Sequence, residues 1–588
     1  MDSVIVTAAR APQPAVDVLS DHLLLTSEDI EHSGADNVVD LLQKQRGIEV
    51  ARNGGPGTTA SVFLRGGDAR QTVVLVDGIR IGSSTTGVAA WSTLPLANID
   101  HIEIVYGPLA TMYGADAIGG VVQVFTKRGV GAPQLSASVA AGSKKGRSYD
   151  ARISGASGAL SYSLFAAHAE DEGFSATKPG NFSYNPDDDG YSKDSLGAQL
   201  GFAIAPGHEA GVLFMHSKLA AQYDNGATSF DARGIQKLQT LAVFSSHQIT
   251  PSFKLNVQLS RADDKSANFA NASATGASSL NTLQTAASLQ GSLSIGPDLL
   301  QMVLEQRGED VASSSTPALA RGRDTSSAGL SYSLKRGAHL ASMSARVDDS
   351  SQYGANATGG LGYGYRITPS LRLNASAGTS FRAPTFNELY YPGFGVASNR
   401  PEKGRNVEAG LQYRAGGAEL TAVYYRNRLT DLLVNTPRCP IEAAAHPYGC
   451  AYNVNRATLS GLSLGIRSRI AQIDVSGAVD LQDPQDDTTG KQLVRRAKRH
   501  ASVAAEYNAG PLIAGVGVQG SGRRFDDPAN KNALGGYGLL NLFASYRFAP
   551  EWSAQLRVNN VANKRYELAR NYGTAGSEVF VGLRYGAR

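Results

Sequence analysis

The sequence predicts a transmembrane β-barrel of about 22 antiparallel strands, with an N-terminal mixed α/β domain inside its lumen. Three observations lead to this fold class. Segments of about ten residues alternate strictly between apolar and polar side chains from residue 130 onward. No stretch reaches the roughly 18 consecutive apolar residues that a transmembrane helix needs. Residues 1–128 follow another pattern, in which short apolar strands are separated by a helix and glycine-rich loops.

The alternation is clearest in residues 406–414. One face carries apolar side chains and the other polar ones: Val407, Ala409, Leu411 and Tyr413 against Glu408, Gly410, Gln412 and Arg414. Residues 552–559 and 579–585 repeat the pattern. Charged residues on the second face do not fit a dry sandwich core, but they fit a water-filled lumen with lipid outside. A soluble propeller is the alternative, and its repeat of roughly 40–50 residues is not seen.

The length of the alternating region sets the size of the barrel. Residues 130–588 leave room for about 20–24 strands of roughly ten residues each. Such a barrel would leave an open pore unless something filled it, and the preceding domain has the right size. We therefore divide the chain into an N-terminal segment (1–10), a plug domain (11–129) and the barrel (130–588).

The N-terminal domain contains one predicted helix, over residues 36–46, with Asp36 as its cap and Gly47 after its end. Short buried strands are expected at residues 61–64, 72–76, 102–105 and 121–126. The first residues of the chain form another short β-type segment. A segment of this kind can add as an extra strand to the sheet edge of another protein, or it can be the first strand of an ordinary domain.

Composition narrows the remaining classes. The net charge of +4 over 588 residues gives no reason to expect a nucleic-acid partner. The only two cysteines, Cys439 and Cys450, lie in one loop and are expected to form a disulfide in an oxidising compartment. Only His446 lies between them, which disfavours a metal site. The chain starts without the basic and apolar segments of an export signal, and we expect it to be the mature form of an exported protein.

Several short motifs, taken together and in order, carry a resemblance to TonB-dependent outer-membrane receptors. They lie at residues 2–8, 38–42, 47–50, 62–66, 74–80, 102–105 and 113–122, and in the barrel at residues 381–384, 401–403 and 559–567. The resemblance implies that TonB binds the N-terminal box, namely Asp2, Ser3, Val4, Ile5, Val6, Thr7 and Ala8. Arg46, Tyr106 and Leu109 depart from the family pattern, which leaves open whether ion pairs join plug and barrel there.

Within the family, the chain most resembles the receptors for cobalamin (vitamin B12). The matching segments are residues 2–10, 53–57, 493–498 and 572–576. The resemblance implies TonB-dependent import of cobalamin, and calcium bound by outer loops through Asp187, Asp189, Asp224 and Asp231. Ca²⁺ takes six to eight oxygen ligands, so an acidic loop suits it. The alternative interpretation of residues 187–190 is a solvated turn.

Cobalamin would meet the loops of the plug that face outward. These loops offer backbone, amide and hydroxyl groups to the amide side chains of a corrin; the predicted contacts are Arg52, Asn53, Gly54, Gly55, Ser83, Ser84, Thr85, Thr86 and Trp91. Trp91 is equally well explained as a residue of the plug core. Tyr390 and Tyr391 belong to an aromatic loop that could close over a flat ligand.

We expect no enzyme, because no catalytic constellation is present in the sequence. The closest alternative is a receptor for a siderophore or another metal chelate. An enzyme built on a barrel would need a catalytic dyad at the rim and no plug, and a passive porin would need neither box nor plug.

Overall fold

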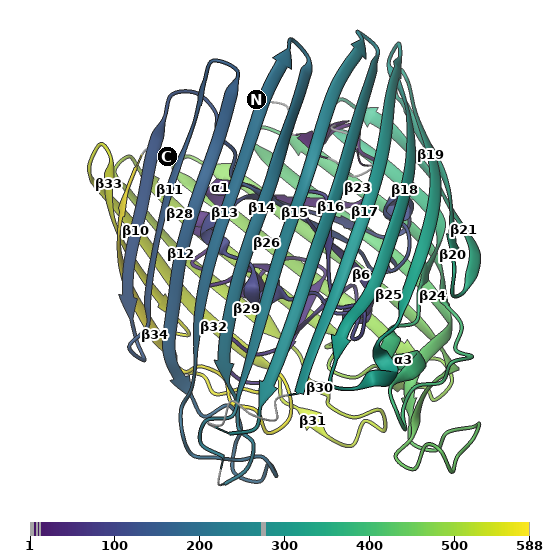
Figure 1. Cartoon of the computed structure of the whole chain (residues 1–588). Helices are drawn as coiled ribbons and strands as arrows, with labels where there is room; N and C mark the ends of the chain where they lie inside the picture. Colours follow the sequence, from purple (N-terminus) through teal and green to yellow (C-terminus); the bar gives the residue numbers. More distant parts are fainter. Residues whose placement is uncertain (1–4, 7–9, 11–12, 228, 272–277, 587–588) are drawn as a thin grey trace.

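The structure, a computed structural model, describes residues 5–6, 10, 13–227, 229–271 and 278–586. The described residues form a closed antiparallel barrel of 22 spanning strands around an N-terminal domain with a mixed sheet (Figure 1). This confirms the predicted fold class. Among the helices of the described residues, none is long and apolar enough to cross a membrane.

The barrel strands are long and follow one another around the wall in chain order. They are β10 (Gln134–Gly142), β11 (Arg147–Ser157), β12 (Leu160–Phe174), β13 (Asp189–Ala205), β14 (His208–Gln222), β15 (Arg233–Thr250), β16 (Phe253–Phe269), β17 (Ser278–Ile295), β18 (Asp298–Ser314), β19 (Gly322–Arg336), β20 (His339–Ser350), β21 (Gly354–Thr368), β22 (Leu371–Arg382), β23 (Glu402–Ala415), β24 (Ala418–Thr436), β25 (Cys450–Ile470), β26 (Ile473–Asp486), β28 (Arg499–Ala509), β29 (Leu512–Ser521), β32 (Tyr537–Ala549), β33 (Trp552–Asn559) and β34 (Glu578–Tyr585). β34 pairs with β10 and closes the barrel.

The two ends of the barrel differ. Turns of a few residues, such as 206–207 and 251–252, join strands at one end. Longer loops lie at the other end, which we call the loop end. It carries the short pieces β27 (Lys491–Gln492), β30 (Arg524–Phe525) and β31 (Ala533–Leu534), the single-turn helix η5 (Pro317–Leu319) and α3 (Phe386–Tyr390). Figure 1 shows α3, β30 and β31 at the bottom, with the marked chain ends toward the opposite side.

The inner domain is built on a five-stranded sheet in the order β3-β8-β9-β6-β7, in which only β6 and β9 are parallel. Its elements are β2 (Gln13–Pro14), β3 (His22–Leu25), α1 (Ser27–His32), α2 (Val38–Gln43), β4 (Ile48–Arg52), β5 (Ala60–Leu64), η1 (Ala69–Gln71), β6 (Thr72–Val76), β7 (Ile79–Ile81), η2 (Trp91–Thr93), η3 (Leu96–Asn98), β8 (Ile99–Tyr106), η4 (Pro108–Tyr113) and β9 (Gly120–Thr126). One apolar core joins the helices to this sheet.

The predicted helix is present but shorter, because α2 covers only Val38–Gln43. Its N-cap is Asn37, whose side chain accepts a hydrogen bond from the backbone of Asp40 at 3.0 Å. The prediction of Asp36 as the cap was wrong. Asp36 instead pairs with Arg557 of the barrel wall and accepts a hydrogen bond from Asn559 at 2.8 Å. Asp36, which the local pattern assigned to the cap, therefore binds residues of the barrel wall that are distant in the sequence.

The two faces of the barrel strands separate as the alternation predicts. Val407 and Leu411 are exposed on the outer surface of β23. Glu408 faces the lumen, where it pairs with Arg65 of the inner domain. The same holds for β33, in which Trp552 and Leu556 are exposed outside.

An arginine cluster ties the inner domain to the wall at the positions where the sequence departs from the family pattern. Arg65 bridges Asp21 of its own domain and Glu408 of β23. The ring of Tyr106 lies under two guanidinium groups, 4.6 Å from Arg65 and 5.1 Å from Arg46. Burial raises the pKa of Asp21, but the two arginines outweigh it and the net pKa is lowered. An ion pair between domain and wall is therefore present here, made by Arg65.

Replacing Gly107 with alanine should break this contact. Gly107 has φ of +71°, and a Cβ at this position would overlap the carboxylate of Glu408. We expect G107A to lower the unfolding free energy by more than the ~1–2 kcal/mol of left-handed strain alone. Gly131, with φ of +67° and nothing within 4 Å, is the control because G131A carries the strain without the overlap. Thermal unfolding in detergent measures both, and equal shifts would contradict the prediction.

Candidate functional site

The loop end of the inner domain presents two loops, at residues 53–59 and 83–90, and each packs against a different part of the barrel. These loops contain most of the substrate contacts predicted from the sequence. The first follows β4, and the second follows β7.

The first loop lies against the segment between β12 and β13. A Cβ on Gly54 would meet the Ala176 side chain at 2.8 Å, and one on Gly55 would lie 3.7 Å from the carbonyl oxygen of Asp189. Only glycine therefore allows the loop to approach the wall so closely at Gly54. The side-chain oxygen of Asn53 accepts a weak hydrogen bond from Arg495 at 3.4 Å. The structure thus brings residues 53–55 next to the acidic loop, which the sequence alone did not indicate.

Three of the four predicted calcium ligands lie beside this loop. Asp189 is buried and accepts a hydrogen bond from the backbone of Ala176 at 2.7 Å. Asp224 accepts from the backbone and hydroxyl of Thr177 at 2.7 and 2.6 Å. The like charges of Asp224, Asp187 and Asp188 act on the buried Asp189 carboxylate. This region is therefore short of positive charge.

Oxygens of these carboxylates that lack a hydrogen-bond partner also indicate that a positive charge is missing here. Among the described residues, one buried oxygen each of Asp187 and Asp224, and both side-chain polar atoms of Asn185, have no hydrogen-bond partner. Asp231 differs, because it pairs with Arg233 at 2.8 Å. As placed, no three His, Cys, Asp or Glu side chains in the described part of the chain converge to hold a metal ion.

The second loop is joined to α3. The carbonyl oxygens of Ser84 and Thr85 accept hydrogen bonds from the backbone of Phe386 and Asn387 at 3.1 and 3.2 Å. Backbone N–H groups in the first turn of α3 therefore donate hydrogen bonds to the inner domain. Ser84 and Thr85 are buried in this contact, while Ser83 is half-buried and Thr86 is exposed.

The aromatic pair of the α3 loop lies directly after this contact. Tyr390 accepts a hydrogen bond from Gln352 at 2.6 Å, and Arg321 lies 4.3 Å above its ring. Tyr391 is 44% exposed. Hydroxyl groups of the inner domain and an exposed aromatic surface thus stand together on this side of the loop end.

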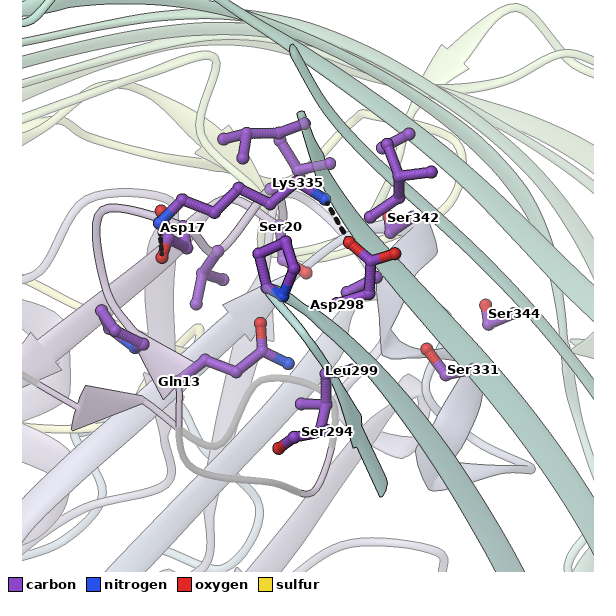
Figure 2. Close-up of a pocket in the computed structure, with 18 of the residues that line it drawn as sticks. Gln13, Asp17, Ser20, Ser294, Asp298, Leu299, Ser331, Lys335, Ser342 and Ser344 are labelled. Carbon is purple, nitrogen blue, oxygen red and sulfur yellow. Dashed lines mark hydrogen bonds and ion pairs between the residues drawn. The ribbon is translucent and has the colours of Figure 1, made fainter. Parts of the chain in front are cut away.

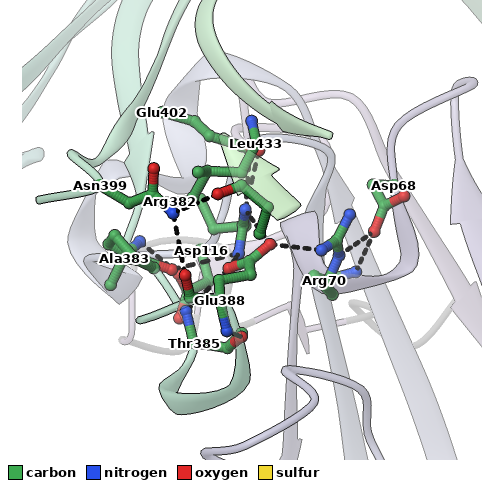
Figure 3. Close-up of polar contacts among 12 residues, drawn as sticks. Asp68, Arg70, Asp116, Arg382, Ala383, Thr385, Glu388, Asn399, Glu402 and Leu433 are labelled. Carbon is green, nitrogen blue, oxygen red and sulfur yellow. Dashed lines mark hydrogen bonds and ion pairs between the residues drawn. The ribbon is translucent and has the colours of Figure 1, made fainter. Parts of the chain in front are cut away.

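A buried polar network holds α3 in place (Figure 3). Arg382, 1% exposed, bonds Glu388 of α3 at 2.9 Å and Glu402 of β23 at 2.8 Å. Glu388 also pairs with Arg70 of the inner domain, and Arg70 bonds Asp68 at 2.7 Å. The arginines outweigh the effect of burial on Glu388, so its pKa is lowered. The network thus connects α3, the barrel and the inner domain through charged groups.

Residues 381–384 stand out as a motif in the sequence, but their role is not visible there. The signal was present, since an arginine in a lumen-facing position of a strand needs an acidic partner. Its partners Glu388 and Glu402 could not be paired with it from the sequence.

Two of the predicted ligand contacts, Trp91 and Arg52, do not face the loop end. Trp91 is 3% exposed and packs in the core with Met215 and Leu238 of the wall, so the prediction of ring contact with a ligand was wrong and the core interpretation holds. Arg52 turns toward α2, where it bonds Asp40 at 2.9 Å. Cys439 and Cys450 are joined by a disulfide within their loop, 5.3 Å apart at Cα.

The described residues of the N-terminal segment, Ile5, Val6 and Arg10, lie toward the opposite end of the inner domain. Ile5–Val6 form β1, which pairs with β2, while Asp2, Ser3, Val4, Thr7 and Ala8 lie outside the described residues. Past the box, Arg10 pairs with Glu305 at 2.8 Å. Figure 2 shows the next anchor, where Asp17 pairs with Lys335 at 2.9 Å beside a cavity of about 240 Å³. Arg10 and Asp17 are thus both tied to the wall by ion pairs.

The chain matches two family descriptions: "TonB dependent receptor-like, beta-barrel" over residues 140–561, and "TonB-dependent Receptor Plug Domain" over residues 15–121. The first match alone covers more than half of the chain. The chain belongs to the TonB-dependent receptors. The inner domain is therefore the plug. As a TonB-dependent receptor, the protein is a transporter of the outer membrane that depends on TonB, and not an enzyme.

Relatives of this receptor are similar over its whole length. The vitamin B12 transporter BtuB of Photobacterium profundum is 29% identical over 99% of this chain and 95% of its own. BtuB of Vibrio vulnificus is 27% identical over 99% and 93%.

Solved structures share the fold at lower identity. The ferric enterobactin receptor PfeA of Pseudomonas aeruginosa has a TM-score of 0.84 at 16% identity, covering 97% of this chain and 100% of its own. The iron transporter FrpB of Neisseria meningitidis has a TM-score of 0.82 at 14% identity, with the same coverage. At these identities the likeness concerns the fold alone.

Proposed function

We propose that this receptor imports cobalamin or a related corrinoid across the outer membrane. The observation that carries the proposal is the full-length similarity to two proteins named as vitamin B12 transporters. The segments at residues 53–57, 493–498 and 572–576, which resemble those of cobalamin receptors, support it further. The siderophore and iron receptors among the solved structures do not favour another cargo, since they are similar in fold only.

The loop end offers chemistry that suits a corrin. Asn53, Ser83 and Thr86 supply amide and hydroxyl groups for the peripheral amides of the ligand. Tyr391 supplies an exposed aromatic surface for a flat ring. A ligand on the plug between these groups would contact both loops of the plug and, through them, two parts of the barrel.

The contacts suggest how binding is passed on. The plug loop at residues 83–87 shares backbone hydrogen bonds with α3, so a ligand that moves α3 also moves this loop. TonB then pairs with the segment Asp2–Ala8 as an added strand, because a β-type segment recognises a sheet edge through its backbone. Energy supplied through this strand remodels the plug and opens a path for the cargo.

We further propose that calcium orders the loops beside residues 53–57. Asp187, Asp189 and Asp224 are the candidate ligands, and the buried unpaired oxygens of Asp187 and Asp224, with the mutual repulsion of all three carboxylates, support this. The carboxylates must draw closer together than they stand. When bound, Ca²⁺ would supply the positive charge that this region lacks. Asp231 is not included, because Arg233 already neutralises it.

Calorimetric titration of the purified receptor with cyanocobalamin tests both proposals. We expect saturable binding in calcium that weakens by at least roughly tenfold in EDTA, which corresponds to about 1.4 kcal/mol. Binding that ignores EDTA would retain the cargo and remove the calcium site. Absence of binding in either buffer would contradict the cobalamin proposal and favour another chelate.

Substitution of single aspartates locates the calcium effect. D224N should reduce the calcium dependence of cyanocobalamin affinity, because one candidate ligand loses its charge. D231N is the matched control and should leave that dependence unchanged, since Asp231 is bound to Arg233. The same calorimetric titration is used for both variants, and equal behaviour would contradict the assignment.

A further inference from the structure

The outer surface of β14, β15 and β16 carries a row of three lysines. Lys218, Lys237 and Lys265 lie directly opposite one another in the register of the three strands. These strands are side by side on the near wall in Figure 1. All three side chains are exposed, and the residues on either side of each point into the lumen. We call this set the lysine row.

A row of like charges at direct cross-strand positions is unfavourable by itself. Opposite residues on one face have Cβ atoms only about 4.5–5.5 Å apart, and equal charges there repel. Among the ion pairs between described residues, none includes a member of the lysine row. No close ion pair between described residues therefore relieves this repulsion.

The nearest carboxylates on the same face are already taken. Asp194, opposite Lys218, pairs with His168 at 2.7 Å. Asp263, two residues before Lys265 in β16, accepts hydrogen bonds from Nε and Nη2 of Arg261 at 2.8 and 3.0 Å. Excess positive charge thus remains on this patch, as expected of a surface whose partner is an anion outside the chain.

The position of the row indicates what the anion is attached to. The lysines stand four residues from the loop-end termini of their strands. On the same face, toward the opposite end, the side chains become apolar and exposed: Leu241, Val243, Leu259 and Val212. This is the lipid-facing band of an outer-membrane barrel, and lysines at its border extend to the headgroup level. A ligand with an anionic head and acyl chains matches both parts.

We propose that the lysine row binds the phosphate groups of an anionic lipid in the leaflet at the loop end. The ammonium groups are point charges that suit phosphate oxygens. The acyl chains lie over Leu241, Val243 and Leu259. This site lies on the outer wall and does not depend on the cargo of the transporter.

The test measures lipid binding by native mass spectrometry in detergent. The probe is bis-phosphorylated lipid A, compared with its phosphate-free form and with inorganic phosphate. The triple variant K218Q/K237Q/K265Q should bind lipid A about 100-fold more weakly, because each lysine near an anionic lipid contributes a factor of roughly five. The control K491Q/K531Q/K564Q removes the same charge from exposed lysines elsewhere and should stay within about twofold.

The melting temperature provides a second readout, because the variant and the wild type should rank differently without lipid and with lipid A. Without lipid, the lysine-row variant should melt at the same or a higher temperature than the wild type, because repulsion is removed. Addition of lipid A should raise the melting temperature of the wild type more than that of the lysine-row variant. Equal binding by the lysine-row variant, or equal binding of the phosphate-free lipid, would overturn the proposal. Displacement of lipid A by millimolar inorganic phosphate would show that the lysine row binds a free anion, and it would also overturn the proposal of a lipid site.

Discussion

Replacing Arg382 with methionine will lower the unfolding free energy by about 3–5 kcal/mol, because Glu402 then remains buried without a counter-charge and Glu388 keeps only Arg70. Arg382 is 1% exposed and bonds both carboxylates at 2.8–2.9 Å. Ligand affinity should fall as well, since Glu388 belongs to α3, which ends at Tyr390 and is followed by Tyr391. Thermal unfolding and cyanocobalamin affinity of R382M, both in detergent, measure the two effects.

Two further variants decide whether charge pairing is the cause. R400M removes an arginine that is 70% exposed and pairs with Asp431 at 2.7 Å; an exposed pair contributes about 0–1 kcal/mol. The triple variant R382M/E388Q/E402Q removes all three charges and should be more stable than R382M alone. If R382M melts like R400M, the network of Figure 3 does not hold α3.

Deleting residues 2–8 will abolish cobalamin uptake while leaving binding at the loop end intact. Ile5 and Val6, the described residues of the box, lie on the opposite side of the plug from the loop-end site, so we expect the ligand contacts to survive removal of the box. V4P should act like the deletion, because proline cannot donate to an added strand. Uptake of labelled cyanocobalamin by intact cells, together with calorimetry on the purified variant, separates transport from binding.

A conservative change is the control for this prediction. V4I keeps the backbone donors and the β-branched side chain, and it should retain uptake. Full uptake by the deletion variant would show that the box of this chain is not needed for transport. Loss of binding in the deletion variant would show that the box acts on folding and not on the partner.

Much of the fold could be predicted because it depends on local alternation. The period of two residues in β23 and β33 was enough to assign Glu408 and Arg557 to the lumen, where both contact the plug. The helix at residues 38–43 was likewise visible in its apolar face, although its cap was not. The alternation therefore placed these charges on the lumen side, but it did not indicate that they contact the plug.

The remainder depends on pairs that are distant in the chain. Trp91 could be a ligand contact or a core residue from its sequence, and only the approach of Met215 and Leu238 decides for the core. Glu388 and Arg70 are more than 300 residues apart, with a sequence separation of 318. The lysine row has a similar origin, since it exists only when the register of three strands is known.

TonB-dependent import of cobalamin by this receptor can be tested by uptake of labelled cyanocobalamin into cells whose own cobalamin receptor is deleted and which express this chain. We predict saturable uptake that stops when the inner membrane is de-energised and that persists in excess ferric enterobactin. Uptake that continues without energy would contradict TonB-dependent transport of this cargo. Absence of uptake, or its inhibition by the ferric siderophore, would contradict the assignment of cobalamin.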